Sequence, residues 1–202
     1  MFIQIKSILE NPVIYTKAMN ILGSSRTRCK NVSDYIKPML GNTIFDMGCC
    51  GPVLILDYLP DDVKYTGTDF NSDYIQSARI KYSSKGEFIH GNVSEHKEYS
   101  FKESFDIVIA IGVIHHLSND DATKLLATVY DCLKKDGRFI SLDNVYDKKL
   151  SIVNKIALKC DRAADNRKKS NYLQKFLLFL FRIEKFSLRL LNYNIIYEVK
   201  IV

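Results

Sequence analysis

The stretch that decides the fold is TIFDMGCCGP, residues 43–52. A short apolar run ends at an acid, Asp46, and Gly48 and Gly51 follow directly after it. Glycine lets a backbone turn sharply and approach a ligand closely, so the pattern indicates a buried strand that runs into a ligand-binding turn. A dinucleotide-binding turn reads G-x-G-x-x-G, with its acid about 20 residues later. Here the acid comes first, which indicates a different ligand.

Outward from this turn, the chain alternates short apolar runs with longer segments of helical period. TIFDMG, VKYTGTDF, GEFIHGNV and RFISLDNV read as strands, and FDIVIAIGVIHHL contains another. PVLILDYL, NSDYIQSARIKYS and SNDDATKLLATVYDCLKKDG read as helices, the second and third with polar caps and the third with a glycine stop. Strand–helix–strand units at this spacing predict a parallel sheet with right-handed crossovers.

The length of 202 residues predicts a single domain with a full α/β core. We expect an N-terminal helical lid over 1–42, a cofactor-binding core over 43–146, a basic helical cap over 147–182 and a strand pair over 183–202. The predicted fold is α/β: a Rossmann-like, seven-stranded, mostly parallel sheet with helices on both faces and an antiparallel C-terminal strand.

The composition is that of a soluble globular protein, with 47% hydrophobic and 26% charged residues. No apolar run approaches the roughly 18 to 20 residues that span a bilayer, and the N-terminus shows no export signal. Five cysteines without disulfide or zinc spacing indicate a reduced, cytoplasmic chain. Cys49 and Cys50 are adjacent and cannot easily share one tetrahedral site, so we expect no metal.

The charge is unevenly distributed within a net +6, because an acidic centre lies between basic ends. A nucleic-acid module usually carries its basic residues along the functional core. This pattern disfavours nucleic acid as a partner and favours an anionic substrate that meets the flanks.

Three polar side chains end successive predicted strands: Asp46, Asp69 and Asn92. Ligands of open α/β sheets bind at the carboxyl ends of the strands. S-adenosylmethionine has no phosphate, but its amino-acid end carries an ammonium that an acid such as Asp46 can help to hold. A carboxylate at Asp69 can accept both ribose hydroxyls, and the Asn92 amide can bond to the adenine edge.

These motifs together resemble the class I S-adenosylmethionine-dependent methyltransferases, in their small-molecule branch. DMGCCGP is similar to the family's acid-x-G-x-G-x-G motif, with Cys50 and Pro52 at two glycine positions. TGTDFNSDYIQSAR resembles the second motif, FDIVIAIGVIHHLS the fourth strand and CLKKDGRFISLDN the fifth-strand motif. The similarity covers residues 44–143, and it implies S-adenosylmethionine as cofactor.

The candidate site residues fall into three groups. We assign cofactor binding to Asp46, Gly48, Cys49, Cys50, Gly51, Asp69, Phe70, Asn92, Val93 and Ile111. His115 and His116 follow the fourth strand, where a methyl acceptor would lie, and an imidazole can take a proton from a hydroxyl there; of the two we prefer His116. We assign acceptor binding to Tyr15, Arg28, Arg162 and Arg167.

The predicted function is in-line methyl transfer from S-adenosylmethionine to a small acceptor that is anionic or linked to a sugar or lipid. Three alternatives stay open: a non-catalytic cofactor-binding or protein-interaction module, a peripheral membrane enzyme acting on a lipid headgroup, and an RNA methyltransferase recruited by the basic ends. The sequence predicts no integral membrane segment, and it does not indicate the oligomeric state.

Overall fold

The computed structural model describes residues 32–49, 55–95, 101–144, 185–191 and 194–200. The chain divides into two compact units, Met1–Asn92 and Val93–Val202. Most of the expected lid (1–42) and all of the expected basic cap (147–182) lie outside the described residues.

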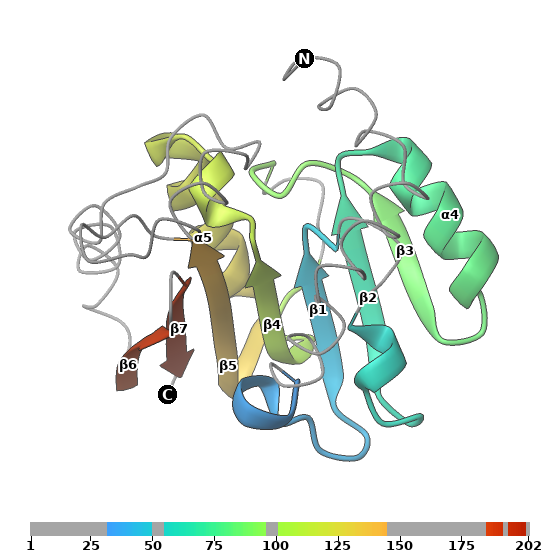
Figure 1. The fold of residues 1–202 in the computed structure, drawn as a ribbon, viewed down its shortest axis with the longest axis horizontal. Helices are drawn as coiled ribbons and strands as arrows, with labels where there is room; N and C mark the ends of the chain where they lie inside the picture. The colour runs from blue at the N-terminus through green and yellow to red at the C-terminus, as the bar shows by residue number, and fades with distance from the viewer. Residues whose placement is uncertain (1–31, 50–54, 96–100, 145–184, 192–193, 201–202) are drawn as a thin grey trace. The chain divides into compact units, whose positions relative to one another are not determined.

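Three parallel strands form the sheet of the first unit, in the order β3-β2-β1 (Figure 1). They are β1 (Thr43–Met47), β2 (Lys64–Asp69) and β3 (Gly86–His90). The near-continuous apolar run of β1 is buried, as parallel strands usually are. The register sets Asp46 opposite Gly67 and Asp69 opposite His90.

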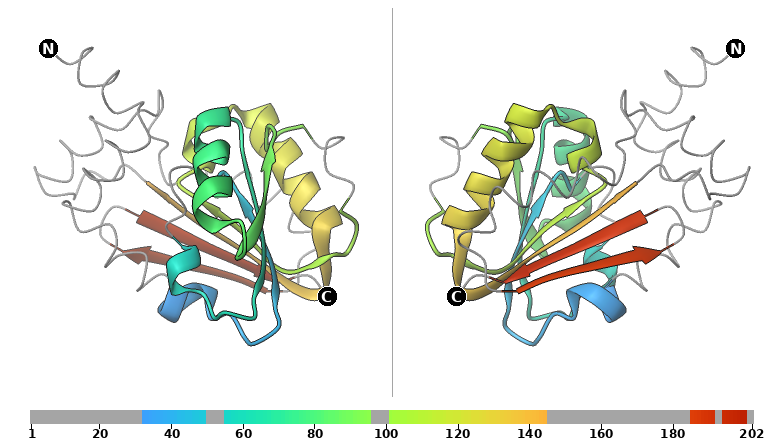
Figure 2. Two further views of the ribbon diagram at one scale, coloured as in Figure 1. Left: turned by 90° about the vertical axis from the view of Figure 1, so that its right-hand side faces the viewer. Right: turned by 90° about the vertical axis from the view of Figure 1, so that its left-hand side faces the viewer.

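Helix α4 (Ser72–Tyr82) connects β2 to β3 and lies along these strands (Figure 2). It begins where predicted, because the Asn71 side chain accepts hydrogen bonds from the backbone N–H groups of Asp73 and Tyr74. Its buried face comprises Tyr74, Ile75, Ala78 and Tyr82. A polar residue of α4 also contacts β3, because the Arg79 guanidinium donates to the Phe88 carbonyl.

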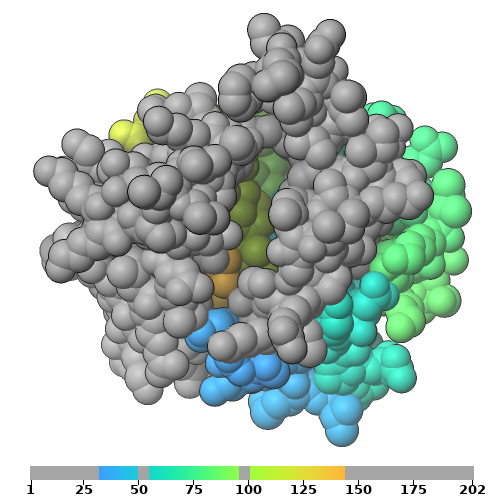
Figure 3. Space-filling model, viewed as in Figure 1, coloured from blue at the N-terminus to red at the C-terminus, as the bar shows by residue number. Residues whose placement is uncertain are grey.

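Two short turns complete the described part of the first unit. η1 (Val32–Ile36) is a π-helical turn, and η2 (Leu56–Tyr58) is a 3-10 turn. The helix expected over 52–59 is therefore reduced, in its described part, to this single turn. The segment between η1 and β1 lies at the surface, where the blue atoms are in view in Figure 3 and Met39 and Leu40 are 71% and 79% exposed.

In the second unit, β4 (Phe105–Ile111) pairs in parallel with β5 (Leu133–Asn144). The 3-10 turn η4 (Ile114–His116) and helix α5 (Asn119–Cys132) connect them. β6 (Lys185–Leu191) and β7 (Asn194–Lys200) pair antiparallel, and β7 pairs antiparallel with β5. Ser118 caps α5 by accepting from the Asp121 N–H, as its sequence indicates.

The glycine stop predicted for α5 is wrong. The helix ends at Cys132 and β5 begins at the next residue, before Gly137. The pairing with β4 then shifts register, from Phe105 opposite Leu133 to Ile107 opposite Arg138. Asp136 takes a positive φ of 65° within this irregularity, so the polar stretch forms a bulge in the strand instead of a helix end.

The predicted α/β fold with a parallel sheet is confirmed. In the described part of the chain the parallel pairing is limited to β1, β2 and β3 in one unit and β4 and β5 in the other. Within the same residues, no helix is long and apolar enough to cross a membrane, and no three His, Cys, Asp or Glu side chains gather as metal ligands.

Candidate functional site

Asp46, near the end of β1, is a buried acid with one partner that fixes it. Its side chain is 6% exposed, and the Tyr65 hydroxyl on β2 donates to its Oδ2 at 2.7 Å. Burial raises the pKa of Asp46 to about 7, against the lowering effect of the Tyr65 hydrogen bond, and the nearby charge of Asp69 adds to the rise. A cation placed here would reverse much of this effect, because it favours the ionised carboxylate.

The turn after β1 has the backbone form that its glycine predicts. Gly48 has a φ of +79°, which side-chain-bearing residues rarely adopt. The N–H groups of Gly48 and Cys49 both donate to the Thr68 carbonyl, at 2.8 and 2.9 Å. Cys49 is buried, and it turns its side chain onto Gly67 of β2, where an added Cβ would lie 2.8 Å from Sγ. Cys50 and Gly51 lie outside the described residues.

Asp69, at the end of β2, presents a buried oxygen that the described residues leave unsatisfied. The side chain is 1% exposed and Oδ1 accepts from the Asn71 N–H at 2.9 Å. Oδ2 is buried and receives no hydrogen bond from the described residues. Burial raises the pKa of Asp69 to about 6, while the Asn71 N–H and His90 act to lower it. A buried acceptor in this state is costly unless a ligand supplies a donor.

Helix capping does not explain Asp69, because Asn71 caps α4. The two oxygens of Asp69 differ: one supports the turn and the other is left for a donor. A ribose hydroxyl is a donor of the required kind.

The end of β3 is joined to the end of β2 by backbone hydrogen bonds. The Gly91 N–H donates to the Asp69 carbonyl at 3.0 Å, and a His90 ring nitrogen lies 2.9 Å from the Phe70 carbonyl. Asn92 follows on the surface, and Phe70 is 76% exposed. An exposed aromatic ring and an amide at neighbouring strand ends offer a face and an edge to a planar base.

In the second unit, His115 is held by a carboxylate that the sequence interpretation did not include. Both its backbone N–H and its Nδ1 lie in hydrogen-bond range of Asp143 Oδ1, at 3.2 and 2.8 Å. Ser141 donates to the other oxygen of Asp143. All three side chains are buried, whereas His116 is exposed and its ring centre lies 4.1 Å from that of His115.

The signal for Asp143 was present in the sequence but not used. SLDN places Ser141 and Asp143 at alternate positions, hence on one face, of an otherwise apolar strand. Buried polar residues at a strand end are the same signal that singled out Asp46 and Asp69. Gly112, with a φ of +71°, turns the chain from β4 toward η4 and donates to the Leu142 carbonyl at 2.7 Å.

The structure thus brings part of the predicted set together. Asp46, Gly48, Cys49 and Asp69 gather at the ends of β1 and β2, with Phe70 and Asn92 at the adjoining strand ends. In the second unit Val93 is buried, Ile111 ends β4, and the histidines follow in η4. Tyr15, Arg28, Arg162 and Arg167 lie outside the described residues.

The chemistry of the first unit's cluster fits the expected cofactor. Its donor set is two buried carboxyls of raised pKa, which suits a cation and hydroxyl groups and repels a phosphate. The orphaned Asp69 Oδ2 and the glycine turn beside Asp46 are the two features that an adenosyl amino acid needs.

Comparison with known proteins gives a family match over part of the chain and a similar fold in solved structures. The family described as "Methyltransferase domain" matches residues 45–141. A SAM-dependent methyltransferase from Archaeoglobus fulgidus has a TM-score of 0.72 at 15% identity, covering 92% of this chain and 98% of its own. A TehB-like SAM-dependent methyltransferase from Corynebacterium glutamicum has a TM-score of 0.67 at 16% identity, covering 95% and 98%.

A third similar structure was solved with a ligand. It is the magnesium protoporphyrin IX methyltransferase from Synechocystis with bound SAH, with a TM-score of 0.66 at 17% identity, covering 90% of this chain and 84% of its own. At such identities these likenesses establish the fold. No curated protein matches the sequence.

Proposed function

We propose, from the match of residues 45–141 to the family described as "Methyltransferase domain", that the protein transfers a methyl group from S-adenosylmethionine to a small acceptor. The observation that carries the proposal is the Asp69 carboxylate, buried with one oxygen that receives no hydrogen bond from the described residues. It lies beside a second buried acid, Asp46, at the ends of neighbouring parallel strands.

The two acids take different parts of the ligand. Asp69 accepts the ribose hydroxyls through Oδ2, because Oδ1 already holds the Asn71 N–H. Asp46 provides the negative charge for the ammonium of the amino-acid end. The turn at Gly48 lets the backbone approach that end closely, because glycine has no side chain and adopts the positive φ of this turn without strain.

The adenine contacts come from the end of β3 and the turn after β2. Asn92 hydrogen-bonds the base edge, and the exposed Phe70 ring packs on its face. Cys49, Val93 and Ile111 complete the assigned contacts, together with Cys50 and Gly51. Sinefungin, which keeps the adenosine and the amino acid without a transferable methyl, provides a probe of this whole set.

S-adenosylmethionine supplies an activated methyl group on a sulfonium. The protein therefore contributes mainly by holding the acceptor in line with the methyl carbon and by excluding water. For an oxygen acceptor, the carbon–sulfur bond would break as the methyl group is transferred, and the sulfur would keep the electron pair. The acceptor hydroxyl also loses a proton, and His116, the exposed member of the histidine pair, receives it.

His115 supports this step indirectly. Its bonds to Asp143 through both the backbone N–H and Nδ1 fix η4, which carries His116. The close approach of the two rings, 4.1 Å between centres, then restrains the His116 imidazole. The acceptor itself is proposed to be anionic, because the basic residues of the chain concentrate outside the acidic core. Arg162, Arg167, Arg28 and Tyr15 stay the candidates for binding it.

Calorimetry with S-adenosylhomocysteine tests cofactor binding, and a screen of metabolite extracts with methyl-labelled S-adenosylmethionine tests transfer. We expect binding that Asp69→Asn weakens, and label in a small product. Absence of heat at millimolar ligand would refute the proposed function. Label found in RNA, or activity that depends on anionic vesicles and is lost with salt, would replace the small soluble acceptor with one of the alternatives.

A further inference from the structure

Tyr65 occupies a slot that two glycines make for its ring. Gly67 lies on the same strand as Tyr65, and an added Cβ there would lie 3.0 Å from Tyr65 Cε1. Gly86 on β3 is the register partner of Tyr65, and an added Cβ there would lie 2.9 Å from Tyr65 Cδ1. Side chains at these positions would displace the ring. The ring is therefore accommodated from its own strand and from the neighbouring one.

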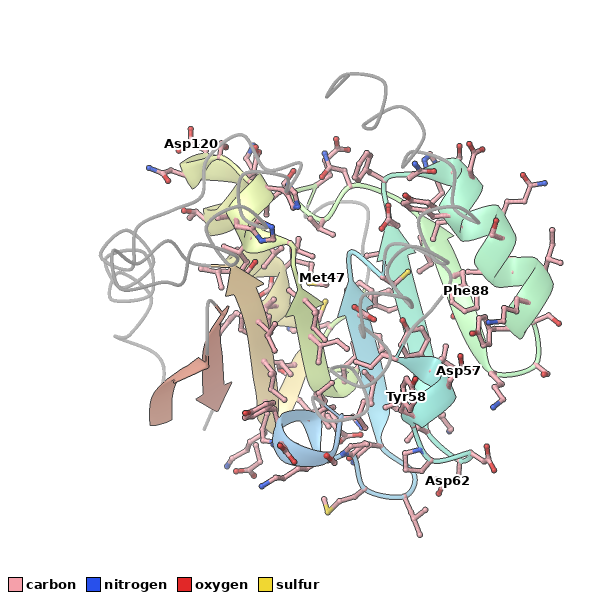
Figure 4. All side chains as sticks on the ribbon, in the orientation of Figure 1. Met47, Asp57, Tyr58, Asp62, Phe88 and Asp120 are labelled. Carbon is pink, nitrogen blue, oxygen red and sulfur yellow. The ribbon has the colours of Figure 1, made fainter. Side chains whose placement is uncertain are left out.

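Further contacts hold the ring in that slot. Phe88, labelled on β3 in Figure 4, has its ring centre 6.0 Å from that of Tyr65 at an interplanar angle of 52°. Tyr65 is 3% exposed. Cys49 Sγ, from the turn after β1, would lie 2.8 Å from the same added Cβ at Gly67. A buried ring fixed on several sides places its hydroxyl in one position.

That position is set by the sheet register. Ile44 lies opposite Tyr65 and Asp46 lies opposite Gly67, so the ring extends two residues along the strand, past the glycine, to reach the acid. The hydroxyl then donates to Asp46 Oδ2 at 2.7 Å. Among the described residues, no hydrogen bond reaches Oδ1, and this second oxygen is the one left for a ligand.

We propose that Tyr65 is a positioning residue for the cofactor's amino-acid end: it orients the Asp46 carboxyl and keeps it ionised for the ammonium. The inference rests on the proposed function, since it presumes an adenosyl amino acid as ligand. It adds a role for a residue on β2 whose hydroxyl donates to the acid and whose ring lies in the slot beside Gly67 and Gly86.

The charged and titratable groups around Asp46 set the direction of the effect. From β2, Asp69 disfavours the charged form of Asp46 and the Tyr65 hydroxyl favours it. From β3, His90 favours the charged form of Asp69. Removing the hydroxyl leaves burial and Asp69 to act on Asp46 without that opposition, so a higher pH is needed to ionise it.

The test compares two ligands that differ at the amino-acid end. S-adenosylhomocysteine carries the ammonium, whereas 5′-methylthioadenosine keeps the adenosine and lacks the amino acid. Both are titrated calorimetrically between pH 6 and pH 9 into the wild type, Tyr65→Phe and Tyr82→Phe. The last variant is a matched control, because the Tyr82 hydroxyl donates to Asp57 at 2.9 Å in the same unit.

We expect Tyr65→Phe to lower the affinity for S-adenosylhomocysteine about tenfold near pH 7 and to shift the pH dependence of this binding to higher pH. Binding of 5′-methylthioadenosine should not change, and Tyr82→Phe should bind both ligands as the wild type does. In an Asp46→Asn background, Tyr65→Phe should have no further effect on the pH profile.

Two results would overturn the inference while leaving the proposed function intact. One is a Tyr65→Phe variant that binds S-adenosylhomocysteine with the wild-type affinity and pH profile; the other is equal weakening of both ligands at every pH, which indicates a merely structural role. If Tyr65→Phe does not fold by circular dichroism, Tyr65→Leu, which is apolar and also has no donor, is used, with the same selective loss expected. A wild type that binds neither ligand would instead refute the proposed function.

Discussion

At the scale of single residues, some polar side chains of the first unit support the backbone at the strand ends, and others are the ones we propose to bind the ligand. Asn71 and Thr68 serve the backbone, through the cap of α4 and the turn after β1. Asp46 and Asp69 are buried acids whose hydrogen bonds leave an oxygen over. Buried acids with raised pKa values that lower stability without supporting the fold are typical of binding sites.

Replacing Asp69 with Asn tests this directly. We expect affinity for S-adenosylhomocysteine to fall by about 10- to 100-fold, because the amide keeps one acceptor and loses the charge-assisted bonds to the ribose. The free energy of unfolding should not fall, since a buried acid of raised pKa is removed. Calorimetry and thermal melts measure the two quantities. Asp73→Asn, an exposed acid of the same helix region, is the matched control and should leave both unchanged.

The two histidines should respond differently to substitution. His116→Gln should lower kcat for an oxygen acceptor by about 10²- to 10⁴-fold and abolish the low-pH limb of the rate profile. His115→Ala should mainly destabilise the protein, by about 1–3 kcal/mol, because it leaves Asp143 buried without its ring partner. Steady-state kinetics across pH and chemical denaturation separate the effects. A stable His115 variant that alone loses the pH limb would reverse the assignment.

The sequence was sufficient to select Asp46 and Asp69, because an acid that ends a buried strand beside glycine has few structural reasons to be there. It was not sufficient for Tyr65 or Asp143. A tyrosine within a strand is ordinary, and only the register of β1 against β2 shows that its hydroxyl reaches Asp46. Likewise, the pairing of Asp143 with His115 joins residues 28 positions apart in the chain.

At the scale of elements, the strands and the starts of α4 and α5 follow the sequence closely, and the C-terminal end of α5 does not. Buried parallel strands are largely apolar, so β1 and β4 have a clear local signal. Helix ends depend on tertiary contacts that no local pattern contains. The backbone N–H groups of Glu103 and Ser104 donate to the carbonyls of Asp131 and Cys132. These hydrogen bonds hold the end of α5 beside the start of β4, so the helix ends before the expected glycine stop.

The contact between β2 and the turn after β1 gives an element-scale prediction. Gly67→Ala should destabilise the protein by about 1–3 kcal/mol, since its Cβ would lie 2.8 Å from Cys49 Sγ and 3.0 Å from the Tyr65 ring. Cys49→Ala in the same chain should recover part of the loss by removing the sulfur. Urea denaturation of both variants and of the Cys49→Ala single variant measures the coupling. Additive effects would show that the turn does not rest on β2 through this sulfur.

At the scale of the whole molecule, the buried acids connect stability to pH. The pKa values of Asp46 and Asp69 are raised to about 7 and about 6, from 3.8 in the unfolded chain. Between about pH 4 and pH 7 the native state therefore binds more protons than the unfolded state, and the free energy of unfolding falls as pH rises. The ligand-free protein carries this penalty in full above pH 7.

We accordingly expect ionisation of these two acids to lower the free energy of unfolding by on the order of 2–4 kcal/mol between pH 5 and pH 8. Denaturant melts of the wild type and of an Asp46→Asn, Asp69→Asn double variant, taken across that range, give the contribution by difference. The double variant should show the shallower pH dependence. Equal slopes for the two proteins would contradict the burial that the structure assigns to these side chains.

The cap of α4 has a consequence for how this chain tolerates change. Because Asn71 caps the helix and Asp69 is proposed to bind the ligand, these two residues, which lie two positions apart, are under different selective constraints. Natural variants at position 71 can interchange among serine, threonine, aspartate and asparagine at little expense to folding. An inherited change at position 69 has no such set of equivalents, so the two sites should diverge at unequal rates among descendants of this protein.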